Sequence, residues 1–203
     1  MSRGRLQYDS SGEPKLQLED GSHISLKQNR PVNGNGVMLL IDCSGSMAGE
    51  KIRQAKAGAI DFAKMTTNKG AAVGVASFES KAVLLTETST SLDAICQSVQ
   101  KIETSGSTNM AEGITLANLA LGEHKPRTIV LVTDGQPDNK EKALEAADEA
   151  RLRDIEIICI GVDGADLEFL QLIATVSDMA VHVESVDLQK ALVASVDLLR
   201  LKE

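Results

Sequence analysis

Two acidic residues each end an apolar stretch of the type that forms buried strands. Asp42 ends the run VMLLID, and Asp134 ends the run RTIVLVTD. Ser44 and Ser46 follow Asp42 in IDCSGSM, and Thr108 lies in the polar loop ETSGSTN. Carboxylates and hydroxyls are hard oxygen ligands, which favour Mg²⁺, Mn²⁺ or Ca²⁺ over zinc or copper. We therefore expect these five side chains to hold a divalent cation, with Mg²⁺ as the first choice.

The charge of this set indicates what else would bind there. Two carboxylates give only two formal negative charges, so a bound dication would keep water or an exchangeable coordination position. A carboxylate of another molecule brings both charge and an oxygen ligand to such a position. We therefore expect a partner protein that supplies Glu or Asp to the metal.

The elements around these residues must bring them together. Apolar strands alternate with amphipathic helices, which predicts an α/β fold with a mostly parallel, doubly wound central sheet and helices on both faces. Ligands of such sheets bind beyond the carboxyl ends of the strands, where Asp42 and Asp134 are expected. We predict strands at 37–42, 71–78, 82–86, 127–134, 155–162 and 180–184, the second and third forming an antiparallel pair. We predict helices at about 49–66, 91–102, 110–121, 139–153, 166–175 and 187–200.

Residues 1–35 differ from the rest of the chain. Leu6 and Tyr8 alternate with polar residues at period two, and the same alternation recurs twice before residue 27. The turn-forming stretches SSGEP and EDGS separate these runs. We predict an N-terminal β-hairpin or meander with a linker over 1–35, followed by the main domain over 36–203.

The motif resembles a known site. Asp42-x-Ser44-x-Ser46, Thr108 in a GSTN loop and Asp134 in TDG together resemble the metal-ion-dependent adhesion site (MIDAS) of von Willebrand factor type A (VWA) domains. The resemblance covers about residues 36–200, and no member of the motif is missing. It implies the Rossmann-like VWA fold. It also implies that Ser44 and Ser46 are direct ligands, that Thr108 binds directly or through water, and that Asp42 and Asp134 often act through coordinated water.

The resemblance also implies a function. VWA domains of this kind are usually non-enzymatic protein-binding modules in which the partner contributes an acidic side chain to the metal. We expect the partner to contact the rim of the site, around Gly45, Ser107, Asn109 and Gly135. Complexes built around an ATPase or a kinase are the candidate setting.

Simpler and competing interpretations exist for the same residues. Asp42, Ser44 and Ser46 are each suitable helix caps, and Asp134 suits a turn in TDGQPD. Asp42 would also suit the nucleophile of a Mg²⁺-dependent phosphatase or phosphotransferase. However, haloacid-dehalogenase-like enzymes need a second Asp where this chain has Ser44, and the sequence indicates no positioned Lys or general acid. We therefore predict that the protein is not an enzyme.

Residues bordering the motif are predicted to have structural roles. Asn109 and Glu112 suit the start of a helix, where an acidic side chain is favoured. Asp138 and Glu50 are predicted to be solvated charges. The three histidines share no motif, so we expect surface or structural roles for His23, His124 and His182.

Composition excludes several classes of partner. The 203 residues carry 21 Lys and Arg against 29 Asp and Glu, a formal net charge of −8, and only 2% are aromatic. A nucleic-acid-binding protein needs basic residues and stacking rings, so we expect no nucleic acid. Neither a polybasic patch nor a membrane-spanning apolar run is present. No signal peptide is visible and the three cysteines form no disulfide framework, so we expect a cytoplasmic protein with free thiols at Cys43, Cys96 and Cys159.

Overall fold

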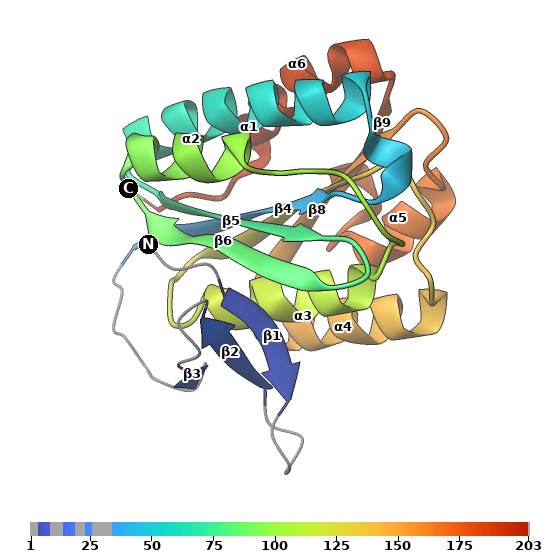
Figure 1. The fold of residues 1–203 in the computed structure, drawn as a ribbon. Coiled ribbons are helices and arrows are strands. Elements are labelled where there is room, and N and C mark those ends of the chain that lie inside the picture. The colour runs from blue at the N-terminus through green and yellow to red at the C-terminus, as the bar shows by residue number, and fades with distance from the viewer. Residues whose placement is uncertain (1–3, 9–13, 19–22, 26–33, 203) are drawn as a thin grey trace.

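One mixed sheet organises the molecule (Figure 1). The computed structural model describes residues 4–8, 14–18, 23–25 and 34–202. Within these ranges nine strands form a single sheet in the order β3-β2-β1-β6-β5-β4-β7-β8-β9. The strands are β1 (Gly4–Tyr8), β2 (Pro14–Leu18), β3 (His23–Ser25), β4 (Gly36–Asp42), β5 (Ala72–Phe78), β6 (Ala82–Ser89), β7 (Arg127–Thr133), β8 (Ile155–Val162) and β9 (Ala180–Val183).

The centre of the sheet is parallel, as predicted. Strands β5, β4, β7, β8 and β9 pair in parallel, whereas β6 pairs antiparallel with β5. Every residue of β4 and of β7 is buried. Since Ile41 pairs with Val132, these two strands end side by side and their following acids emerge at one edge of the sheet.

Helices cover both faces of the sheet, which confirms the doubly wound prediction. Figure 1 shows α1, α2 and α6 on one face and α3 and α4 on the other. Apolar residues spaced three and four apart on α1, such as Ala55, Ala59 and Phe62, are fully buried. The α-helices of the described ranges are α1 (Glu50–Asn68), α2 (Leu92–Gln100), α3 (Met110–Ala120), α4 (Lys140–Leu152), α5 (Leu167–Ile173) and α6 (Leu188–Ala194). No helix in the described part of the chain is both long and apolar enough to cross a bilayer.

The prediction of one continuous helix over 187–200 is wrong in extent. The α-helix α6 ends at Ala194, and a 3₁₀ turn, η4 (Ser195–Leu198), follows it. The Ser195 hydroxyl donates to the Leu192 carbonyl at 2.7 Å. A serine that bonds the backbone of the preceding turn competes with regular helical bonding, which accounts for the tightened end.

The N-terminal strands form the predicted antiparallel meander and extend the sheet at its edge. Among the described residues, two pairs, Gly4 with Leu84 and Arg5 with Val83, join β1 to β6. Leu6 is 5% exposed and anchors the meander to the core. Residues 10–13 of the first predicted turn, the whole predicted turn at 19–22 and most of the predicted linker lie outside the described residues, whereas Pro14 begins β2. The division of the chain into 1–35 and 36–203 stays a prediction.

A buried histidine organises the amino-terminal edge of the sheet. His124 is 2% exposed, with Nδ1 3.2 Å from the Gly34 carbonyl oxygen and Nε2 2.8 Å from the Thr88 hydroxyl. A Cβ atom on Gly36 would lie 2.5 Å from the imidazole Cγ, so this position needs glycine. His124 therefore has the structural role predicted for it.

The same edge fixes two other segments. Arg127 donates from Nη1 to the Gly122 carbonyl at 2.8 Å and from Nη2 to the Arg153 carbonyl. The Asn35 side chain forms two bonds with Lys202: Nδ2 donates to its carbonyl at 3.0 Å, and Oδ1 accepts from its amide at 2.8 Å. These bonds tie the start of β4 to the end of the described chain.

Candidate metal centre

The turn after β4 carries the first three predicted ligands. Asp42 is fully buried, and its Oδ1 accepts the Ser44 amide at 2.8 Å, which holds the turn in shape. A short 3₁₀ turn, η1 (Gly45–Met47), then leads into α1. Gly49 has φ +83°, a backbone conformation that glycine adopts without strain. The chain therefore reverses within seven residues of the strand end and exposes Ser46 at the surface.

A continuous series of short contacts joins these residues to Asp134. The Ser44 and Ser46 hydroxyl oxygens lie 3.0 Å apart, and the Ser46 hydroxyl donates to Asp134 Oδ1 at 2.8 Å. Thr108 completes the group, since a Cβ atom on Gly135 would lie 3.5 Å from Thr108 Oγ1 and 3.9 Å from Ser46 Oγ. The structure therefore brings all five predicted side chains to one place at the carboxyl edge of the sheet.

Thr133 supports the deepest acid of the centre, and the sequence analysis missed it. Its hydroxyl donates to Asp42 Oδ2 at 2.6 Å. Together with the Ser44 amide, this bond engages both carboxylate oxygens of Asp42. Thr133 directly precedes Asp134 at the end of β7, but a buried strand threonine carries no signal that separates it from a packing residue.

Asp138 holds the loop that carries Thr108. Its Oδ1 accepts the Thr108 amide at 3.0 Å, and its Oδ2 accepts the Ser107 hydroxyl at 2.6 Å. The Asp138 amide donates back to the Thr108 carbonyl at 2.9 Å. The prediction of a solvated charge near the rim is therefore incomplete: the Asp138 side chain is exposed, but it also fixes the loop that carries the third hydroxyl of the centre.

Lys51 is the cation nearest the centre, and the sequence analysis missed it as well. Its ammonium group forms an ion pair with Asp134 Oδ2 and donates to the Ser46 carbonyl at 3.1 Å. A second acid, Asp163, lies 3.8 Å away. Lys51 lies five residues after Ser46 in the first turn of α1, so helical geometry aims it back toward the site.

The electrostatics of the centre favour an added positive charge. Burial raises the pKa of Asp42, bonds from Thr133 and Ser44 oppose that shift, and the charge of Asp134 adds to it. A cation placed against these oxygens would offset the cost of burying the charge. In the described ranges no three or more His, Cys, Asp and Glu side chains gather as a metal site. The centre is therefore a set of two carboxylates and three hydroxyls, which is the chemistry that suits hard dications.

The predicted rim surrounds the centre. Gly45 and Ser107 are exposed, and Asn109 and Gly135 are partly exposed. The Gly45 amide donates to the Gly106 carbonyl at 3.3 Å, which joins the two ligand-bearing loops. Asn109 caps α3 as predicted, accepting the Glu112 amide at 3.3 Å. The role of this rim in partner binding stays a prediction.

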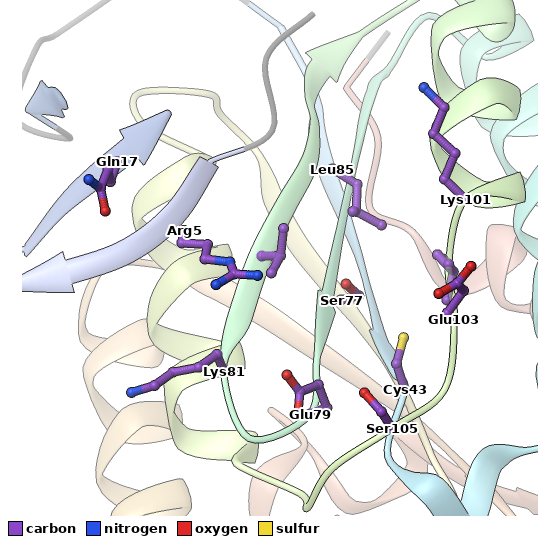
Figure 2. Close-up of a pocket in the computed structure, with 12 residues that line it drawn as sticks. Arg5, Gln17, Cys43, Ser77, Glu79, Lys81, Leu85, Lys101, Glu103 and Ser105 are labelled. Atoms are coloured by element: carbon purple, nitrogen blue, oxygen red, sulfur yellow. The ribbon is translucent and has the colours of Figure 1, made fainter. Parts of the chain in front are cut away.

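Cys43 faces away from the centre, as expected from its place between two ligand candidates. It is 3% exposed, and its thiol donates to the Ile41 carbonyl at 3.4 Å. Burial raises its pKa to about 12, so the thiol stays protonated at neutral pH. Figure 2 shows it near Ser77 and Ser105, in the lining of a pocket.

Three known proteins show what this chain is similar to. Matrilin-4 from mouse is 41% identical over 68 residues, which are 32% of this chain and 11% of matrilin-4. The vWF domain of the pilus tip protein Mfa5 from Porphyromonas gingivalis superposes with a TM-score of 0.76 at 14% identity, covering 81% of this chain and 94% of that domain. Proximal thread matrix protein 1 from the mussel byssus, in a form with a zinc-occupied MIDAS motif, gives a TM-score of 0.68 at 19% identity, covering 84% of this chain and 48% of that one.

The family model gives the broadest match. The model of the von Willebrand factor type A domain matches residues 36–194, which include all five residues of the centre. Domains of this family are protein-interaction modules, and some of them bind a divalent cation at a MIDAS. This chain therefore belongs to the von Willebrand factor type A domain family.

Proposed function

We propose that this domain binds Mg²⁺ through a complete MIDAS and uses the metal to capture an acidic side chain of a partner protein. The observation that carries the proposal is the contact series from Ser44 through Ser46 to Asp134, with Thr108 beside it. Mn²⁺ and Ca²⁺ use the same oxygen ligands and are the alternative metals.

The exposure of the ligands supports a site that a partner can reach. Asp42 and Ser44 lie at the base of the centre, with 0% and 2% of their surfaces exposed, whereas Ser46 lies at the surface. The metal would supply a positive charge that attracts a carboxylate. The chain's own residues would position it: the Ser44, Ser46 and Thr108 hydroxyls as ligands, and Asp42 and Asp134 as the negative charges that hold it.

The geometry gives little support to the phosphatase alternative. A nucleophilic Asp42 would need a free carboxylate oxygen, but both oxygens accept hydrogen bonds and the residue is fully buried. The nearby Lys51 pairs with Asp134 and not with Asp42. We therefore propose a binding module without enzymatic activity, and incubation with a generic phosphoester is expected to release no phosphate.

We also propose a cytoplasmic setting, in a complex such as one built around an ATPase or a kinase. The support is compositional: Cys43, Cys96 and Cys159 are all free thiols, as expected in a reducing compartment. Fractionation of cells that express the tagged protein tests the location.

Calorimetric titration with Mg²⁺ tests the metal proposal directly. Asp134→Ala should abolish measurable binding, whereas Asp178→Ala, which removes an exposed acid away from the centre, should bind as the wild type does. Unchanged affinity in Asp134→Ala would refute the proposal.

Partner capture tests the second half of the proposal. Immobilised wild-type domain should retain an acidic peptide with Mg²⁺ but not with chelator, and a peptide with Gln in place of Glu should not bind. Equal retention with chelator would contradict capture through the metal.

A further inference from the structure

A second hollow lies behind the metal centre, on the side where the N-terminal meander joins the sheet. It encloses about 430 Å³, within the range of small-molecule sites. Arg5 and Gln17 of the meander form one wall, and Lys101, Glu103 and Ser105 from the segment after α2 form the opposite wall (Figure 2). Arg5 and Gln17 lie outside the residues that match the family model, so this pocket depends on an element outside the family's common core.

The pocket contains charges of both signs that do not neutralise one another. In the described part of the chain, Arg5, Lys101 and Glu103 take part in no ion pair, and Lys81 reaches Glu112 only at 4.0 Å. Glu79 accepts the neighbouring Ser80 amide but has no cationic partner there. Figure 2 shows the Arg5 guanidinium directed toward β6, on the side of the pocket opposite Glu103.

The floor between these charges is aliphatic. Val83, Leu85 and Ile102 line it. Ser77 and Ser105 add hydroxyls on the side nearest the metal centre. A ligand that matches this lining needs an anionic group, a cationic group and a short apolar body.

We propose that this pocket binds a small zwitterion of the amino-acid type with an aliphatic side chain. Its carboxylate pairs with the Arg5 guanidinium, which presents two parallel donors to a carboxylate. Its ammonium group lies against Glu79, and its side chain covers Val83 and Leu85. None of the five residues of the metal centre lines the pocket, so this binding does not require the metal.

Titration with L-leucine, followed by backbone amide chemical shifts in the presence of chelator, tests the proposal. Millimolar leucine should shift the amides of Cys43, Ser77 and Ser105. Leucinamide, which lacks the carboxylate, and N-acetylleucine, which lacks the ammonium group, should each bind at least about tenfold more weakly, the factor expected for one lost charged contact. Absence of shifts with leucine, or equal binding of all three compounds, would overturn the proposal.

Matched variants identify the two charged contacts. Arg5→Gln should weaken leucine binding about tenfold and remove the advantage of leucine over leucinamide, and Glu79→Gln should remove its advantage over N-acetylleucine. Glu79→Asp, which keeps the charge, is the second variant: should Glu79→Gln lower the melting temperature, Glu79→Asp should keep the preference for leucine over N-acetylleucine. Arg53→Gln, which removes an exposed arginine elsewhere, should bind leucine as the wild type does.

Asp134→Ala separates this proposal from the metal centre. It should lose Mg²⁺ and keep leucine binding. Loss of leucine binding in Asp134→Ala, or wild-type binding in Arg5→Gln, would show that the probe binds elsewhere and would overturn the proposal.

Discussion

Both edges of the central sheet bury polar side chains, but these side chains have different roles at the two edges. At the amino edge, His124, Arg127 and Asn35 bond to backbone groups of other segments. At the carboxyl edge, Asp42 and Asp134 each accept a hydrogen bond from a hydroxyl, and Lys51 of α1 pairs with Asp134.

The two edges differ in the groups to which their buried polar side chains bond. Polar groups that bond distant backbone segments stabilise the fold, because each bond removes a buried unpaired group. The carboxyl edge instead buries an acid: burial raises the pKa of Asp42, the charge of Asp134 adds to the shift, and the buried charge costs stability in the absence of a cation. The amino edge thus uses its polar side chains to join segments of the fold, whereas the carboxyl edge buries an acid at a cost in stability at the candidate metal centre.

Removing the buried acid gives the largest expected effect. Asp42→Asn should weaken Mg²⁺ binding by more than about a hundredfold, measured by calorimetric titration, because it removes half of the charge of the centre. Asp178→Asn is the matched control at an exposed acid.

The same variant also tests the cost of the carboxyl edge. Because the pKa of Asp42 is raised, its charge favours the unfolded chain at neutral pH, and this penalty disappears below its unfolded pKa. Asp42→Asn should therefore be at least as stable as the wild type in chelator at pH 7, with a margin that shrinks as the pH falls toward 4. A clear loss of stability at pH 7 would remove the contrast between the two edges.

Removing the buried histidine tests the opposite edge. His124→Ala deletes two hydrogen bonds and a packed ring, so we expect a loss of about 2 kcal/mol in the free energy of unfolding, measured by urea denaturation. Mg²⁺ affinity of the folded variant should stay unchanged. A change in metal affinity without a loss of stability would mean that the edges are not independent.

The lysine at the carboxyl edge should have a smaller effect. Lys51→Met removes a cation that bonds an oxygen of the metal centre, so Mg²⁺ affinity should rise about threefold, the scale of a partly exposed ion pair. Lys140→Met is the control, because Lys140 pairs with Asp166 at 2.7 Å and not with the centre. A fall in affinity would show instead that Lys51 is needed to position Asp134.

The pH dependence of stability is the smallest effect and again distinguishes the edges. Burial lowers the pKa of His124 from its ordinary value of 6.5, with Arg127 adding to the shift and the bond to Gly34 opposing it. Below pH 6.5 the unfolded chain takes up this proton first, so stability in chelator should fall as the pH drops from 6.5. His124→Ala should lack this component, and an identical pH slope in the two proteins would contradict the assignment.

The sequence predicted the fold and the centre because both follow from local patterns. Apolar runs such as VMLLID identify buried strands, and parallel pairing then places Asp42 and Asp134 at one edge. Lys51 and Thr133 could not be predicted, since their roles depend on helix orientation and strand register. Asp138 was predicted to be a solvated charge because the sequence does not show the bonds that this exposed side chain makes to the Thr108 loop.

The two hydrogen bonds between Asn35 and Lys202 determine where a label or a surface can be attached to this domain. It brings the beginning of β4 and the end of the described chain together, on the side opposite the strand ends that carry Asp42 and Asp134 (Figure 1). A fluorophore, a bead or a fused protein joined after residue 202 would point away from the candidate metal centre. In single-molecule and surface-capture measurements the domain can therefore be attached after residue 202 without obstructing the candidate metal centre.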